Sequence, residues 1–254
     1  MRRWTRAAAA VVTVAACSFT PLTNRVDLGS DDFVVFVGEG VDGNTDLFVS
    51  LASGGSVTQL TYTGSVEMLP RLSTEGGVLA FIRARDTTTS SPRALIMMNL
   101  LSASERRLDL PDDSGVPTAL GWNADESAVY LRMPAGTWRI ETPPAPMQMI
   151  PVPGPEMLVA DTAVATWLGA ARFAQAVPCP DGGVCVTGPR GDTTQIAPQG
   201  VSPLRWGADS IAWFEGDNLI VRGLGPGPAR RVTWRRAPAN PRDASYAAAL
   251  RPNP

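Results

Sequence analysis

The chain has 254 residues, 44% of them hydrophobic, so it is long enough to bury a substantial core within one domain. Its net charge of −2 gives no reason to expect nucleic acid or an anionic membrane as the main partner. All 22 basic residues are arginine and there is no histidine. The absence of histidine excludes Ser-His-Asp and Cys-His nucleophile systems, histidine acid–base catalysis and histidine metal sites.

Residues 1–16 have the pattern of a secretory signal peptide. Arg2, Arg3 and Arg6 precede a run of small apolar residues that extends from Ala7 to Ala16. The run is shorter than the roughly 20 residues that a membrane-spanning helix needs. We therefore expect the segment to direct export and not to remain as a transmembrane helix.

The export segment ends in Val14-Ala15-Ala16-Cys17. This tetrad resembles the lipobox of bacterial lipoproteins, in which the cysteine is acylated and becomes the first residue of the mature protein. The resemblance implies a lipid attached to Cys17, a tether over residues 17–23 and a membrane as one partner, because several acyl chains give stable anchoring. The alternatives are ordinary cleavage after Ala16 and a cysteine placed there by chance.

Residues 24–234 read as five imperfect units of four short strands each, separated by turns rich in Gly, Asp, Asn and Pro. Their anchors Leu72, Trp122, Trp167 and Trp206 recur about every 40 to 50 residues, the spacing of propeller blades. The predicted strands are 24–28, 33–37, 46–51 and 57–62; 68–73, 78–83, 94–100 and 105–110; 118–123, 128–133, 137–142 and 148–152; 164–168, 172–177, 184–187 and 193–197; and 203–206, 211–215, 219–223 and 231–234.

The second unit carries the clearest motif, Pro-Arg-Leu-Ser-Thr-Glu-Gly-Gly-Val-Leu-Ala-Phe-Ile-Arg at 70–83. With Asp-Gly-Asn-Thr-Asp-Leu-Phe-Val at 42–49 and Gln-Leu-Thr at 59–61, it resembles one unit of the TolB-like β-propeller family. The resemblance implies an all-β fold, a β-propeller of about five four-stranded antiparallel blades; the alternatives are six blades or an incomplete ring. The tryptophans Trp122, Trp167 and Trp206 are then expected to fill the wedges between blades.

The tail at 235–254 is rich in Arg, Ala and Pro, and we expect it to be mostly disordered. The alternative is that residues 245–250 add a strand that closes the ring.

Cys179 and Cys185 flank the turn Asp181-Gly182. Residues on either side of a hairpin turn lie within disulfide range, and an exported protein meets an oxidising compartment, so we expect these two cysteines to be bonded. A metal or redox site would lack further Cys or His ligands. The alternating Asp42, Asn44 and Asp46 resemble the start of a calcium loop, but the expected glycine and glutamate do not follow, so we expect a hairpin turn there and no metal site.

The TolB resemblance implies protein–protein work in the cell envelope, with no enzyme activity and no cofactor. The expected partner is another envelope protein, bound at one mouth of the ring, where turn residues such as Glu75, Asp125 and Asp209 are candidates for the rim. The alternatives are a purely structural accessory subunit and a glycan-active enzyme with paired carboxylates. The predicted innermost strands 68–73, 118–123, 164–168 and 203–206 contain no Asp or Glu, and the chain has no Gly-x-Ser-x-Gly, which disfavours an enzyme.

Overall fold

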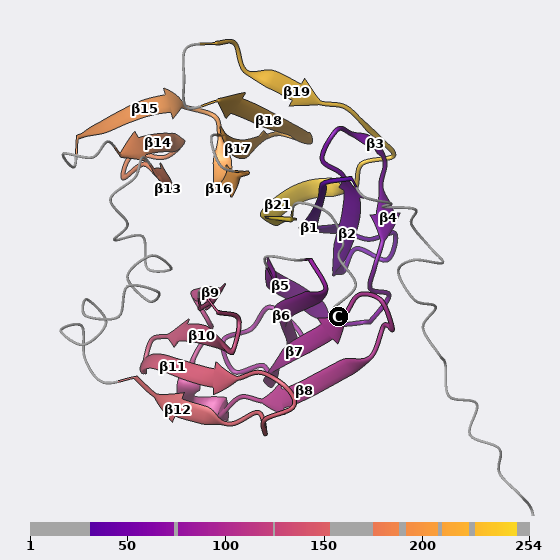
Figure 1. Ribbon diagram of the computed structural model, residues 1–254, viewed down its shortest axis with the longest axis vertical. Helices are drawn as coiled ribbons and strands as arrows, with labels where there is room; N and C mark the ends of the chain where they lie inside the picture. The colour runs from indigo at the N-terminus through magenta and orange to yellow at the C-terminus, as the bar shows by residue number, and fades with distance from the viewer. Residues whose placement is uncertain are drawn as a thin grey trace, which may run out of the picture.

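The computed structural model describes residues 31–73, 76–123, 125–152, 175–187, 192–207, 210–223 and 227–247. Within these ranges the fold is all-β: the one helical element is the short 3-10 turn η1 (Asp112–Ser114). Small antiparallel sheets stand around a common centre in a propeller-like arrangement (Figure 1). The all-β, propeller-like prediction is therefore confirmed at this level.

Four of the sheets have four strands each among the described residues. Sheet I is β21 (Ala239–Ala247), β1 (Phe33–Glu39), β2 (Thr45–Leu51) and β4 (Thr58–Gln59); sheet II is β5 (Val66–Leu72), β6 (Val78–Ala84), β7 (Arg93–Asn99) and β8 (Glu105–Asp109); sheet III is β9 (Ala119–Trp122), β10 (Ala128–Met133), β11 (Gly136–Glu141) and β12 (Met149–Pro151); sheet V is β16 (Val201–Trp206), β17 (Ser210–Glu215), β18 (Asn218–Gly223) and β19 (Arg230–Val232).

Sheet IV differs, since it has three described strands: β13 (Gln175–Pro178), β14 (Val184–Thr187) and β15 (Thr193–Ala197). A separate parallel pair joins β3 (Gly55–Ser56) to β20 (Trp234–Arg235). The described residues thus give four complete four-stranded sheets and not the five that were predicted. The predicted strands at 24–28 and 164–168, together with Trp167, lie outside the described residues.

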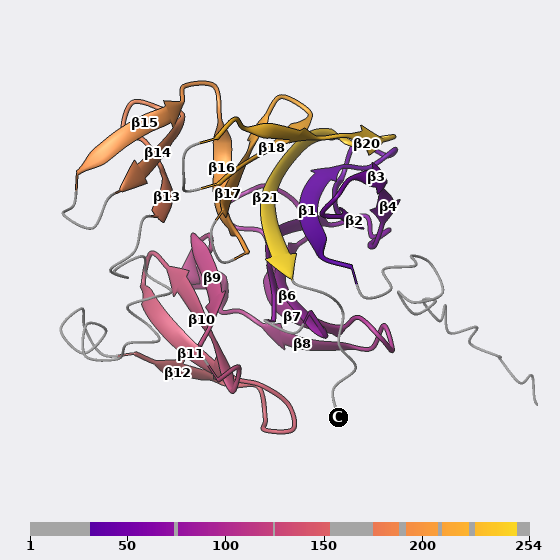
Figure 2. The same cartoon turned by 45° about the horizontal axis from the view of Figure 1, so that its top comes forward.

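The innermost position of sheet I is occupied by β21, which pairs antiparallel with β1 (Figures 1 and 2). The prediction that the tail is mostly disordered is corrected for residues 239–247, and the alternative of a closing strand describes them better. The physical reason lies in β1, whose residues Phe33 to Val37 are fully buried and leave an inner backbone edge that needs hydrogen-bonding partners. Residues 248–254 lie outside the described part.

The interior strands β1, β2, β6 and β7 bury both faces, because their side chains alternate between two neighbouring cores. In β1, Val35 and Val37 join the core shared with sheet II, whereas Val34 and Phe36 join the core shared with sheet V. Further cores lie between sheets II and III and between sheets IV and V. The apolar density of the predicted strands follows from this two-sided burial.

Trp206 fills the wedge between sheets V and I, as predicted. Its ring is 6% exposed and lies 4.8 Å, centroid to centroid, from that of Tyr246 in β21. We expect Trp206→Ala to lower the free energy of unfolding by about 3–5 kcal/mol, because nothing refills the cavity. Chemical denaturation measures the effect. Trp206→Phe keeps an aromatic ring and should lose clearly less; equal losses would contradict the packing role.

Candidate interaction cleft and a buried carboxylate pair

A cleft of about 450 Å³ lies between sheets II and III, at the edge where their hairpin turns gather. The residues that line it mostly end or begin a strand, and they include Ser73, Asn99, Ser104 and Thr142. Short turns on rigid strands hold side chains in fixed places, which suits them to binding. The cleft volume is within the range of small-ligand and side-chain pockets.

Trp122 forms one wall of this cleft. Its indole N–H donates a hydrogen bond of 3.0 Å to the carbonyl oxygen of Arg71, which ties sheet III to sheet II. The ring also packs against the core between these sheets. Trp122 therefore presents a half-buried aromatic surface whose orientation is fixed on both sides.

Asp125, one of the predicted rim residues, lines the same cleft. Its Oδ1 accepts hydrogen bonds from the backbone N–H of Ser127 at 3.1 Å and from the Ser127 hydroxyl at 2.7 Å. The hydroxyl bond is the larger of the causes that lower the pKa of Asp125, so this carboxylate stays ionised at neutral pH. The other two predicted rim residues, Glu75 and Asp209, lie outside the described part of the chain.

Sequence reasoning missed two further charges of the cleft, Arg106 and Glu126. Arg106 is exposed on β8 and forms no ion pair with any described residue, whereas its neighbour Arg107 pairs with Asp109 at 2.5 Å. Glu126 has a left-handed backbone, with φ of 59°, in the turn between β9 and β10. The cleft thus combines an indole, an unpaired cation from sheet II and two carboxylates from sheet III.

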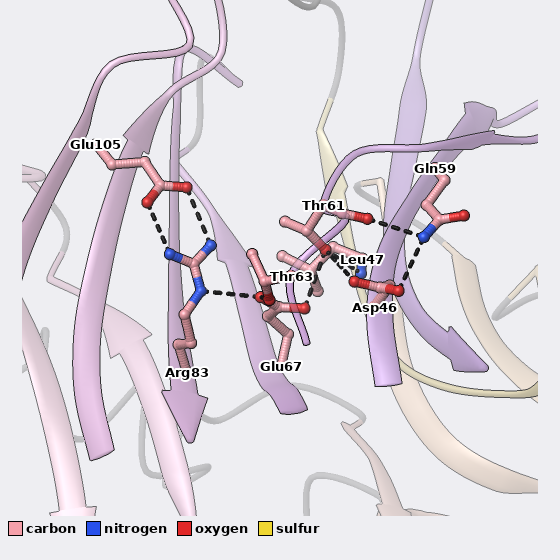
Figure 3. Close-up of polar contacts among 8 residues, drawn as sticks. All are labelled: Asp46, Leu47, Gln59, Thr61, Thr63, Glu67, Arg83 and Glu105. Carbon is pink, nitrogen blue, oxygen red and sulfur yellow. Dashed lines mark hydrogen bonds and ion pairs between the residues drawn. The ribbon is translucent and has the colours of Figure 1, made fainter. Parts of the chain in front are cut away.

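A second polar cluster is closed to solvent and joins sheets I and II (Figure 3). Asp46 of β2 and Glu67 of β5 are both 0% exposed, and both lie within hydrogen-bond distance of the hydroxyl of Thr61, at 3.1 and 3.0 Å. The same hydroxyl oxygen accepts the backbone N–H of Leu47 at 2.9 Å.

A hydroxyl has a single proton, so it cannot donate to both carboxylates at once. Thr61 satisfies Asp46 and Glu67 together only when one of the two acids is protonated and donates to the hydroxyl oxygen. Burial raises the pKa of Glu67 from 4.5 to about 7, despite the opposing hydrogen bonds from Thr63 and Arg83, and burial also raises the pKa of Asp46. Geometry and desolvation therefore agree on one proton held between the two acids.

Arg83 links this pair to the surface (Figure 3). Its Nε donates to Glu67 at 2.9 Å, and its two terminal nitrogens donate to Glu105 at 2.8 and 3.1 Å. Glu67 corrects the prediction that the innermost strands contain no acid, because β5 begins two residues earlier than predicted; β21 adds Asp243. Since Glu67 and Asp46 are inaccessible, the arrangement binds sheet to sheet and reaches no substrate.

The predicted disulfide between Cys179 and Cys185 is present, with the two Cα atoms 5.2 Å apart across the turn from β13 to β14. At the other acidic turn, Asp42 accepts hydrogen bonds from Asn44, while Asp46 turns inward to Thr61 and Gln59. This is the predicted hairpin turn. Among the described residues, no group of three or more His, Cys, Asp or Glu side chains is placed to hold a metal ion.

No protein-family model and no curated protein sequence matches this chain. Among solved structures, the chain is similar to TolB from Acinetobacter baumannii, with 12% identity and a TM-score of 0.42 over 89% of this chain and 68% of that one. It is also similar to a putative 6-phosphogluconolactonase from Bacteroides uniformis (12%, 0.33, over 80% of this chain and 68% of that one) and to an acylaminoacyl peptidase from Pyrococcus horikoshii (13%, 0.34, over 79% and 30%).

Likeness at these identities and TM-scores carries no argument about activity. The description of the fold therefore rests on the sheets and hydrophobic cores of this chain alone. In the described part of the chain, no helix has the length and apolar character needed to cross a bilayer.

Proposed function

We propose that this protein is a non-enzymatic β-propeller module of the bacterial cell envelope, held to a membrane by a lipid on Cys17, and that it binds another envelope protein. The observation that carries the binding role is the cleft between sheets II and III. There Trp122, Arg106, Asp125 and Glu126 gather on rigid strand ends at one edge of the ring. Tryptophan and arginine are the residue types enriched at protein-recognition hot spots, and here they stand beside two carboxylates.

We further propose that sheet IV is a fifth blade. Its three strands follow the same antiparallel order as the later strands of the other sheets. The alternatives are a sixth blade and an incomplete ring. The total number of strands around the centre distinguishes them.

The non-enzymatic assignment is supported by the state of the acids. A glycan-active enzyme needs one accessible carboxyl with a raised pKa as general acid and a second accessible carboxylate. Among the residues that the structure describes, the acids with a raised pKa, Asp46 and Glu67, are fully buried, and the accessible Asp125 has a lowered pKa. Turnover of any glycan by the purified protein would contradict the proposal.

The binding role is tested by capture of partners from detergent-solubilised envelopes. Arg106→Glu reverses the unpaired cation of the cleft, whereas Arg107→Glu makes the same change on the next residue, which pairs with Asp109 outside the cleft. We expect wild type and Arg107→Glu to retain one stoichiometric partner and Arg106→Glu to retain less than about a tenth of it, since charge reversal at a recognition centre weakens binding by 2 kcal/mol or more. Equal capture by all three proteins would place the interface elsewhere.

The anchor is tested separately by mass spectrometry of the mature amino terminus. We expect cleavage before Cys17 and the added mass of acyl chains. An uncleaved chain with an unmodified Cys17 would remove the lipoprotein assignment and leave the binding test intact.

A further inference from the structure

A second cleft, of about 390 Å³, lies at the outer part of sheet V on the side that faces sheet IV. It is independent of the cleft between sheets II and III and of any partner bound there. Its inner wall is apolar: Trp213 of β17 and Ile220 of β18 are directly opposite each other in the sheet, and they are 3% and 8% exposed. Both belong to the core between sheets IV and V.

The strand register places two arginines on this same face. Arg231 of β19 is directly opposite Ile220, and Arg222 of β18 lies two residues beyond Ile220, opposite Ile211 of the same core. Directly opposite residues share a face, and so do residues two apart on a strand. Arg222 and Arg231 are thus diagonal neighbours at the rim of one cleft, close enough for their long side chains to converge.

Neither arginine forms an ion pair or side-chain hydrogen bond within the described part of the chain, although both line the cleft. The carboxylate of Glu215 lines it too, but this group accepts the indole N–H of Trp213 at 2.8 Å. Arg83, Arg107 and Arg139, by contrast, all have carboxylate partners. The cleft therefore carries an excess of positive charge that the described protein leaves uncompensated.

A charged residue on an edge strand often serves only to prevent sheet-to-sheet aggregation, and Arg231 on β19 fits that role. Arg222 does not, because β18 is an interior strand with β17 and β19 on its two sides. Two guanidinium groups offer planar forks of N–H donors that match the oxygens of a phosphate, which accepts several such bonds at once.

We propose that this cleft is a binding site for a phosphate group, with Arg222 and Arg231 as its ligands and Trp213 and Ile220 as an apolar floor for the group that bears the phosphate. Glu215 at the cleft provides an acceptor for a hydroxyl of the same ligand. A soluble phosphate compound and the headgroup of an anionic phospholipid both present this chemistry.

The test uses the full chain with Cys17→Ser, so that no acyl chain brings it to lipid. Inorganic phosphate is titrated by calorimetry at low ionic strength, and sedimentation with phosphatidylglycerol and with phosphatidylcholine vesicles is measured in parallel. The site variant is Arg222→Gln/Arg231→Gln. The control is Arg235→Gln/Arg236→Gln, which removes the same charge from exposed arginines that do not line the cleft. Unchanged thermal unfolding verifies that both variants are folded.

We expect wild type and the control to bind phosphate in the millimolar range or tighter and the site variant to bind about tenfold more weakly or not at all. Vesicle binding that needs phosphatidylglycerol and fails in the same variant assigns the phosphate to a lipid headgroup, whereas phosphate binding alone assigns it to a soluble ligand. Wild type that binds neither probe would overturn the proposal. Equal weakening in the two variants would also overturn it, because binding would then follow diffuse charge.

Discussion

A chain that ends at Pro238, and so lacks β21, is expected to be unfolded or aggregated. β21 occupies the inner position of sheet I, pairs with β1 along its length and also contacts two other sheets. The hydroxyl of Ser245 accepts the backbone N–H of Leu72 in sheet II at 2.9 Å, and the ring of Tyr246 packs at a tilt against that of Trp206 in sheet V. Loss of β21 opens two cores at once and exposes the backbone edge of a fully buried strand.

The stability of a domain is typically only about 5–15 kcal/mol, so the combined loss of backbone pairing and burial should exceed it. The measurement is thermal and denaturant unfolding followed by circular dichroism and tryptophan fluorescence. The control is a chain that ends at Ala247, which keeps every contact of β21 described here. A chain truncated at Pro238 with a cooperative transition near that of the control would show that the fold does not depend on β21.

The second large effect concerns the proton shared by Asp46 and Glu67. The pKa of Glu67 is about 7 in the folded protein, raised by burial from 4.5, so the folded state binds this proton more tightly than the unfolded state. The stabilising contribution of this proton is therefore fully present below pH 4.5 and is lost as the pH rises through about 7. At about 1.4 kcal/mol for each unit of pKa shift, the loss reaches about 3 kcal/mol.

Glu67→Gln places an amide where the protonated acid stands, and this amide donates to Thr61 at every pH. We expect the variant to match wild type below the unfolded-state pKa of 4.5 and to exceed its free energy of unfolding above about 7. Urea denaturation across this pH range measures the difference. The variant keeps Asp46 and its neighbour Asp42 in place.

Glu105→Gln is the matched control, because it makes the same chemical change on the outer partner of Arg83. We expect it to retain the fall in stability with rising pH. If Glu67→Gln showed the same pH dependence as wild type, the shared proton would have to lie elsewhere.

The local hairpins could be predicted from the sequence because each depends on a short-range signal. The strands at 128–133, 184–187 and 193–197 coincide with β10, β14 and β15, since turns rich in glycine, aspartate or proline bound them. A strand in the tail was only the alternative prediction, over residues 245–250, because the composition around Pro241, Arg242 and Asp243 resembles a solvated tail. The stability of β21 comes from β1, at the opposite end of the described chain, and from the bulges that adapt their register.

The site shows the same division. Asp125 was found from its turn motif, a local feature, and the structure places it in the cleft. Arg106 was missed because its contribution depends on which face of β8 turns to sheet III. The next residue, Arg107, is also an arginine, but it pairs with Asp109 and does not line the cleft. The proton between Asp46 and Glu67 depends on the position of Thr61, whose hydroxyl lies between the two acids. The spacing of these residues along the chain does not show that they meet.

The pairing of β21 with β1 is tested most directly by an engineered disulfide. Val35 and Ser245 are directly opposite each other in the two strands, so Val35→Cys/Ser245→Cys in a Cys17→Ser background should form an intramolecular bond on mild oxidation of the folded protein. Val35→Cys/Tyr246→Cys is one residue out of register, with its side chains on opposite faces, and should not. Peptide mapping under non-reducing conditions gives the answer. Efficient cross-linking of the first pair alone is the predicted result; no cross-link, or equal cross-linking of both pairs, would contradict the pairing of β21 with β1 in this register.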